Sequence, residues 1–223
     1  MFRLVDLETT GFEPDEDEIV EIASVDLDTS GHVFNPMEHL VNPGCPIPPE
    51  SSAVHHIIDE DVAGAMSLDA VLPHYKADGF TYVAHNARFE RSFLGALGDV
   101  PWLCTYKAAA RVWPEAPSHS NQVLRYWLKL EVDRDIGMPH RALPDCLVTA
   151  QLLIRLMDNA SVEDMLRWTD MPVLKRTCGF GKHVGQLWSD VPKDYLQWIV
   201  RNGTFDEDTM YTAKVHLGLI EHK

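Results

Sequence analysis

The sequence predicts an α/β protein, with a mixed β-sheet flanked by helices and a small C-terminal module. Three observations indicate this fold. Apolar, β-branched runs alternate with turn residues over the first 41 residues, as in consecutive antiparallel strands. Two later short apolar runs each precede a segment of helical periodicity. Beyond about residue 158 the pattern changes to a glycine-flanked basic turn and a new amphipathic stretch.

The first three strands follow from their composition and turns. Residues 2–8 form an apolar run that closes in Asp6 and Glu8. Residues 18–28 are rich in Ile and Val, and Thr29-Ser30-Gly31 is a plausible hairpin turn. Residues 32–41 then form a third strand, antiparallel to the second. Residues 42–49 contain four prolines and are therefore predicted to be a loop.

The remaining elements alternate between helix and strand. Residues 80–84 and 101–104 are compact apolar strands. Helical spacing, or a position between loop signals, predicts helices at about residues 50–56, 59–65, 67–76, 86–97, 106–113, 121–130 and 143–157. Pro144 stands in the first turn of the last of these, where proline is tolerated. The order β-β-β-α-β-α-β-α-α describes a mixed sheet with helices on its faces.

Charge is distributed unevenly along the 223 residues, whose formal net charge is −15. The first 75 residues hold 16 acidic residues and one basic residue, whereas the remaining residues hold 18 of each. Residues 165–201 have a local excess of three basic residues, six against three. The acidic first 75 residues form either a solvated surface or a segment that holds divalent cations. Bound cations would allow an acidic protein to bind phosphate groups.

The chain is expected to be cytoplasmic and to have no contact with a membrane. No apolar stretch approaches the roughly 20 residues that a membrane span needs. An acidic residue, Asp6, interrupts the N-terminus before the core of a signal peptide could form. The four cysteines are scattered and form no Cys-x-x-Cys pair, which argues against a disulfide framework and a zinc knuckle.

Asp6 and Glu8 are the first candidates for a functional site. They lie two residues apart on a predicted strand, so both side chains point to the same face. Adjacent carboxylates repel each other unless a cation neutralises them, and Mg²⁺ and Mn²⁺ prefer oxygen ligands. The alternative is a strand edge with two solvated acids.

Two further motifs carry an acid near the start of a helix. His85-Asn86-Ala87-Arg88-Phe89-Glu90 follows a strand and opens a helix. His140-Arg141-Ala142-Leu143-Pro144-Asp145 places an acid at a late helix start and a histidine in the preceding loop. From the residues alone, each motif is equally explained by helix capping and the helix dipole, with Asn86 as a cap in the first.

Together the three motifs resemble the DEDDh family of DnaQ-like 3′–5′ exonucleases. The shared pattern is Asp-x-Glu-Thr, then His-Asn-x-x-Phe-acid, then His-x-x-x-x-Asp, and it covers about residues 1–158. The segments Ala53-Val54-His55-His56-Ile57 and Cys104-Thr105-Tyr106-Lys107 agree with it. The C-terminal segment around Phe180-Gly181-Lys182 most resembles the bacterial exonuclease X group of that family.

This resemblance implies a ribonuclease H-like fold over residues 1–158. Residues 159–223 would form a small C-terminal module that binds nucleic acid, with the boundary between about 158 and 178. Asp6, Glu8, Glu90 and Asp145 would hold two divalent cations, Mg²⁺ or Mn²⁺. His140 would be the general base that takes a proton from the attacking water. The product would be nucleoside 5′-monophosphates released from DNA 3′ ends.

The resemblance also implies residues that contact the substrate. Leu7, Thr9 and the backbone around Thr10 and Gly11 would contact the terminal nucleotide, with His55 on its other side. Asn86 and Lys182 complete the expected contacts. The expected partner is DNA, as single-stranded or duplex 3′ ends, or RNA. DNA polymerases and repair proteins are further expected partners.

Three other functions remain open from the sequence. One is an exoribonuclease, because RNA-trimming relatives share the same acids. Another is a catalytically weakened domain that binds 3′ ends or serves as a proofreading partner of a polymerase. Glu90 favours this second alternative, since the family usually has Asp at that position. The third, an unrelated acidic metal-binding or interaction module, would have to match all three motifs by chance.

Overall fold

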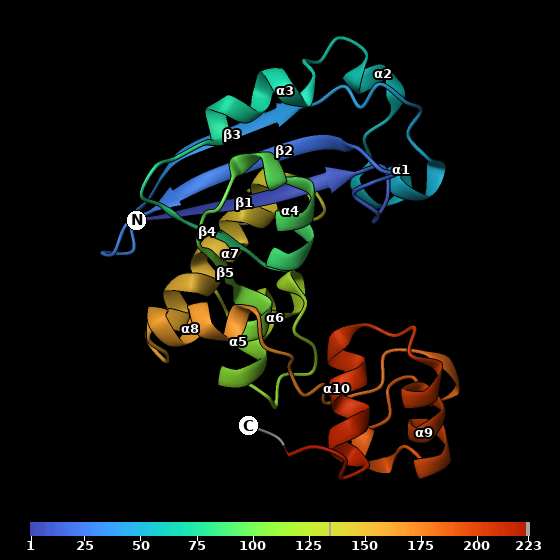
Figure 1. Cartoon of the computed structure of the whole chain (residues 1–223). Coiled ribbons are helices and arrows are strands. Elements are labelled where there is room, and N and C mark those ends of the chain that lie inside the picture. The colour runs from blue at the N-terminus through green and yellow to red at the C-terminus, as the bar shows by residue number, and fades with distance from the viewer. Residues whose placement is uncertain (134, 222–223) are drawn as a thin grey trace.

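The computed structural model describes residues 1–133 and 135–221. Its centre is a five-stranded sheet in the order β3-β2-β1-β4-β5 (Figure 1). The strands are β1 (Phe2–Thr9), β2 (Ile19–Leu27), β3 (Val33–Leu40), β4 (Thr81–Ala84) and β5 (Trp102–Cys104). β1 pairs antiparallel with β2 and parallel with β4, so the sheet is mixed, which confirms the expected fold.

Helices cover both faces of this sheet and form the C-terminal module. They are α1 (Pro49–His55), α2 (Asp59–Val62), α3 (Leu68–Val71), α4 (Ala87–Phe93), α5 (Thr105–Val112), α6 (Asn121–Trp127), α7 (Ala142–Met157), α8 (Val162–Thr169), α9 (Lys193–Asn202) and α10 (Glu207–His216). The helices expected over 67–76 and 86–97 are each shorter and end in a 3-10 turn, Leu72–Tyr75 and Gly95–Leu97. Pro73 and Gly95, both poor in helix interiors, stand in these two turns.

Alternation along β1 creates two apolar layers. Phe2 and Leu4 pack with α7, α6 and α5 on one face of the sheet. Val5 and Leu7 pack on the other face with α4 and the segment around Tyr75. Because side chains alternate along a strand, Asp6 and Glu8 continue the face of Leu4, against which α7 packs. The sheet thus delivers both acids to the start of α7.

A third apolar core lies in the C-terminal module. It includes Cys178, Trp188, Leu196, Ile199 and Ala213, with α9 and α10 packed together. α8 does not belong to it, because its buried Met165 joins the core beneath the sheet and α8 contacts β5 and α5. Within the expected interval of 158 to 178, we therefore propose that the boundary lies after α8.

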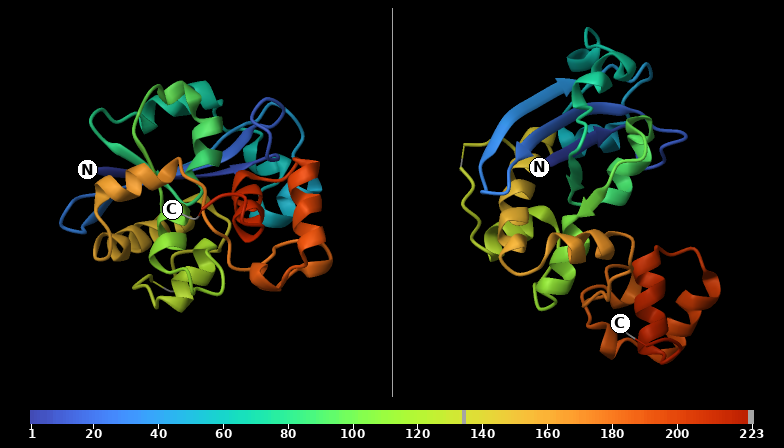
Figure 2. Two further views of the ribbon diagram at one scale, coloured as in Figure 1. Left: turned by 60° about the horizontal axis from the view of Figure 1, so that its bottom comes forward. Right: turned by 60° about the vertical axis from the view of Figure 1, so that its left-hand side comes forward.

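The module is attached to the sheet domain through α5. Lys107 Nζ lies 2.5 Å from Asp208 Oδ1, and both side chains are nearly buried. Arg111 donates to the carbonyl oxygens of Met171 and Pro172 in the connecting segment. Figure 1 and Figure 2 both place the module beyond α5, at the end of the molecule opposite to α3. None of the helices in the described ranges has the length and apolar character of a membrane span.

Candidate active site

Three carboxylates meet where β1 ends and α7 begins. Asp6 and Glu8 come from β1, and Asp145 comes from the first turn of α7. One oxygen of each lies within 4.8 Å of the others. α7 is fixed against the sheet here because the Cys146 thiol contacts the carbonyl oxygens of Ala23 and Leu4, 3.5 and 3.8 Å away. The group could hold a divalent cation.

Glu90 approaches this group from α4, which follows β4. It is only 4% exposed, and its Oε2 atom has no hydrogen-bond partner among the described residues. It is not one of the three acids within 4.8 Å of one another, but its charge contributes to the raised pKa of Asp6. A buried carboxylate oxygen without a partner is unfavourable unless a cation or a proton satisfies it.

Burial and mutual repulsion raise the pKa values of these acids when no cation is bound. Desolvation is the main cause that raises the pKa of Glu8 to about 8, with the charges of Asp145 and Glu21 adding to it. Burial likewise raises the pKa of Glu90 to about 8. The pKa of Asp6 lies well above its usual range, first through burial and then through the charges of Glu90, Glu8 and Asp145. This is the electrostatic signature of a site built for positive charge.

Asp145 is oriented by two donors from neighbouring segments. Gln122 Nε2 donates to its Oδ1 at 2.6 Å, and the backbone N–H of His140 donates to its Oδ2 at 3.0 Å. Asn121 Nδ2 donates to its backbone carbonyl at 3.2 Å. Burial raises the pKa of Asp145, and the first two hydrogen bonds act in the opposite direction. The sequence motifs did not include Gln122, whose position at the start of α6 is its only signal.

A second buried acid, Glu21, stands directly opposite Glu8 in the β1–β2 register. Its side chain is fully buried and pairs with the Arg141 guanidinium, while the Ala142 N–H donates to it at 2.8 Å. Arg141 also counteracts the rise in the pKa of Glu8. Sequence reasoning missed this pair, although an acid inside the apolar run of residues 18–28 was a visible signal.

His140 lies at the mouth of the site. It is exposed and adopts a φ of 60°, and its ring has no hydrogen-bond partner among the described residues. Its charge, when protonated, lowers the pKa of Asp145, which places the ring near that carboxylate. The backbone of this residue therefore holds a site acid, while its side chain remains exposed.

The residues expected to contact a nucleotide have different surroundings. The Leu7 side chain is buried in the core, so only its backbone could reach a ligand. Thr9 Oγ1 donates to the Gly11 carbonyl at 2.5 Å, and Thr10 Oγ1 donates to Asp17 Oδ1 at 3.0 Å. These bonds shape the loop after β1.

His55 lies buried at the end of α1. Its Nδ1 accepts from the Ile57 N–H at 3.0 Å, which places the ring proton on Nε2. Nε2 has no partner among the described residues, and burial lowers the pKa of the ring. This neutral ring offers one unsatisfied donor.

His85 and Asn86 serve different purposes. His85 bonds Thr105 Oγ1 at 3.0 Å and the His119 carbonyl at 2.8 Å, and burial lowers its pKa to about 4. It is therefore a neutral residue that joins β4 to α5. Asn86 is exposed at the start of α4, and its side chain makes no capping hydrogen bond. Its amide is available to a ligand.

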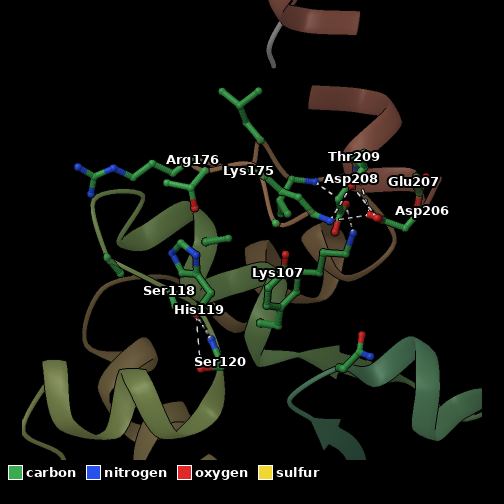
Figure 3. A pocket seen from close by; sticks show the side chains of 18 of the residues that line it. Lys107, Ser118, His119, Ser120, Lys175, Arg176, Asp206, Glu207, Asp208 and Thr209 are labelled. Atoms are coloured by element: carbon green, nitrogen blue, oxygen red, sulfur yellow. Dashed lines mark hydrogen bonds and ion pairs between the residues drawn. The ribbon is translucent and has the colours of Figure 1, made fainter. Parts of the chain in front are cut away.

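A cavity of about 910 Å³ lies between the sheet domain and the C-terminal module (Figure 3). Its lining includes Asn86 and Arg88 from the sheet domain, and Gly179 and Phe180 from the module. Two of its lysines are tied to acids of the module, Lys107 to Asp208 and Lys175 to Asp206 at 2.8 Å. The four candidate metal ligands do not line this cavity. Lys182 lies outside it as well, exposed on the 3-10 turn Gly181–His183.

Comparison with known proteins identifies close similarity to nucleases. The family model described as Exonuclease (RNase T) matches residues 4–153. Exodeoxyribonuclease 10 of Escherichia coli K12 is 42% identical over 208 residues, which cover 91% of each chain. The unmatched share of this chain is smaller than its C-terminal module, so the match extends into the module.

Solved structures agree with this result. The structure of exonuclease X in complex with 5′-overhanging duplex DNA aligns with a TM-score of 0.67 and 42% identity, covering 76% of this chain and 99% of that one. The nuclease domain of 3′hExo, a DEDDh family member bound to rAMP, aligns with a TM-score of 0.58 over 71% of this chain and 92% of that one. At 18% identity, the second structure bears on the fold alone.

The raised pKa values predict an unusual dependence of stability on pH. Between about pH 4.5 and 8 the folded protein without a cation binds more protons at Glu8 than the unfolded chain does. The free energy of unfolding should therefore fall as pH rises through this window. Mn²⁺ at about 100 times its dissociation constant at pH 8 should restore about 2.7 kcal/mol there, or roughly 5–10 °C in Tm. The same Mn²⁺ concentration should restore less at pH 6, where protons compete with the cation for the acids.

Thermal unfolding with EDTA or Mn²⁺ at both pH values measures this effect. Glu8→Gln should weaken both the pH dependence and the response to Mn²⁺. Glu16→Gln removes the same charge from an exposed position and serves as the matched control. Equal behaviour of the two variants would contradict the electrostatic description of the site.

Proposed function

Because the chain belongs to the RNase T family of exonucleases, we propose that its carboxylate group cuts phosphodiester bonds at DNA 3′ ends by a two-metal mechanism. The chain is a 3′–5′ DNA exonuclease similar to exonuclease X. The observation that supports the proposed site most strongly is the meeting of Asp6, Glu8 and Asp145 within 4.8 Å, with the buried Glu90 beside them. The products would be nucleoside 5′-monophosphates.

The residues present fit divalent cations. Hard cations such as Mg²⁺ and Mn²⁺ prefer carboxylate oxygens, and Oε2 of Glu90 is a buried oxygen that has no other partner among the described residues. Asp6, Glu8, Glu90 and Asp145 would hold them. When bound, two such ions lower the pKa of the attacking water and neutralise charge on the leaving oxygen.

The protein's own contribution is to position groups and to move one proton. His140, exposed beside Asp145, would take the proton of the attacking water on its free ring nitrogen. Gln122 and the His140 N–H hold the Asp145 carboxylate in one orientation, so this ligand needs no reordering during turnover. Arg141 neutralises Glu21 and so limits the negative charge around Glu8.

The loop after β1 and the end of α1 would hold the terminal nucleotide. His55 presents an unsatisfied Nε2–H donor there, and a ligand oxygen would satisfy it. Thr9, Thr10 and Gly11 would contribute through their backbone, as would Leu7, since their side chains are buried or already bonded, or absent in Gly11. Asn86 would contact the strand from the start of α4.

DNA is the proposed substrate because the relatives at 42% identity are an exodeoxyribonuclease and an exonuclease bound to DNA. A duplex with a 5′ overhang has a recessed 3′ end, which is one form that the substrate would take. Association with DNA polymerases or repair proteins, and activity on RNA, remain predictions from the sequence.

Metal dependence is the first test of this function. Hydrolysis of a labelled oligonucleotide should stop in EDTA and return with Mg²⁺ or Mn²⁺. Asp6→Ala should abolish turnover without lowering the Tm of the EDTA-treated protein, because it removes a half-buried carboxylate that is repelled by its neighbours. The exposed Glu16→Ala is the matched control. Full activity in EDTA would refute the two-metal site.

The role of His140 is tested with variants that remove its ring and keep its backbone conformation. His140→Ala should lower kcat by about 10²–10⁴ and alter the acidic limb of the pH–rate profile. Since its φ is 60°, His140→Asn is the better-tolerated variant, because asparagine adopts this conformation readily. It should lose as much activity, while the Mn²⁺ concentration at half-maximal activity changes little. A variant that loses metal binding instead would show that the residue is a ligand or a structural element. His32→Ala, on the exposed hairpin, is the control.

Glu90 distinguishes an adapted site from a weakened one. A slight shift of α4 away from β1 would accommodate the longer acid, since Glu is one methylene longer than Asp. We expect adaptation, so Glu90→Ala should remove activity and Glu90→Asp should lower it. The measurement is kcat in saturating Mn²⁺. A gain of about tenfold in Glu90→Asp, or about 1.4 kcal/mol of barrier, would instead identify a weakened nuclease.

A further inference from the structure

The C-terminal module presents an exposed aromatic and basic surface, here called the module face. It consists of Lys182, His183, Val184, Tyr195 and Trp198. Trp198 is 47% exposed and Val184 is 64% exposed, which is high for large apolar side chains in a module with its own core. Lys182 is the one of these residues that the family resemblance assigns to the substrate, and neither the metal ligands nor the proposed proton transfer use any of them.

Tyr195 organises the module face. Its ring stacks on Trp198 with centroids 5.2 Å apart and planes at 27°, and it meets the His183 ring at 4.6 Å. Lys182 Nζ lies 5.3 Å from the centre of the same ring. Gly181 has a φ of +63°, and a Cβ at this position would lie 2.5 Å from the Tyr195 hydroxyl. Glycine allows the backbone at this position to lie so close to Tyr195. The basic turn therefore packs against Tyr195, whose ring stacks on the exposed Trp198.

The charge around the module face is opposite to that of the whole chain. Residues 175–203 hold five basic and two acidic residues, within a chain of net charge −15. Lys175 is tied to Asp206, whereas Lys182 has no carboxylate partner among the described residues. The amino group of Lys182 is thus available to an external anion.

We propose that the module face binds single-stranded DNA, with a base stacked on Trp198 and a neighbouring phosphate at Lys182. An exposed indole beside an unpaired lysine matches the alternation of base and phosphate along a strand, and stacking tolerates any base sequence. The inference rests on the proposed function only for the identity of the strand, which would be the one being digested.

The position of the module face agrees with this role. The cavity between the two parts of the chain is lined both by Asn86, at the start of α4, which also carries Glu90, and by Phe180 of the module. Phe180 in turn packs against Tyr195, with centroids 6.4 Å apart. A strand that passes Asn86 and follows this cavity would therefore come to Phe180, next to the module face.

Binding of a labelled thymidine dodecamer to the full chain in EDTA tests the proposal. Fluorescence anisotropy at several salt concentrations gives the affinity and its salt dependence. Trp198→Leu should weaken binding by about tenfold or more, whereas Trp198→Phe, which can still stack, should stay near wild type. Lys182→Gln should weaken binding and make the slope of log affinity against log salt shallower by about 0.7. Tyr126→Leu removes a 72% exposed aromatic side chain from α6 and is the matched control.

Three outcomes would overturn the proposal. The first is unchanged affinity in both Trp198→Leu and Lys182→Gln. The second is equal loss in Trp198→Leu and Trp198→Phe with wild-type affinity in Lys182→Gln, which would assign Trp198 to the packing of the module. The third is a wild-type dimer in sedimentation that Trp198→Leu dissociates without a change in DNA affinity, which would show that a second copy covers the face. Because binding is measured without divalent cations, failure of the nuclease function would appear separately, as absent hydrolysis by the wild-type protein in Mn²⁺.

Discussion

The backbone of this protein holds the carboxylates of Asp6, Glu8 and Asp145 close enough to repel one another. The two-residue period of β1 sends Asp6 and Glu8 to the face on which α7 packs, and the apolar contacts of that face bring the first turn of α7 to them. Arg141 and the Ala142 N–H anchor the same turn on Glu21 of β2. The acids cannot move apart without disrupting the apolar core, so bound cations or protons must neutralise their charge.

This constraint also shapes how the protein can meet DNA. A chain of net charge −15 with a buried acidic group gains little from long-range attraction to phosphates. Divalent cations reverse the sign of the field at the cutting site itself. Away from it, the basic residues of the C-terminal module and the exposed Trp198 offer contacts that do not depend on metal. The buried ion pair between Lys107 and Asp208 keeps these two regions in a defined relation.

Short-range patterns predicted the five strands and the three acid-bearing motifs because each is a local property of the chain. α8 and α10 were not predicted, although Ser161 and Asp206 cap them through their side chains. Gln122, Glu21 and Arg141 were also missed, since each acquires its role only when β2, α6 and α7 meet. The family resemblance supplied the grouping of Glu90 with the other acids, which spacing alone left open. The catalytic and metal-binding roles of Asp6, Glu8, Glu90, His140 and Asp145 remain predictions.

The central claim is that the four acids hold two cations together. Crystals of the protein grown with Mn²⁺ and a nucleoside 5′-monophosphate at pH 8 test it through anomalous scattering at the manganese edge. The account predicts two peaks roughly 4 Å apart between β1 and α7, as in other two-metal sites, with Asp6, Glu8, Glu90 and Asp145 as ligands. A map with no peak there, or with a single ion held by other residues such as Asp206, would contradict it.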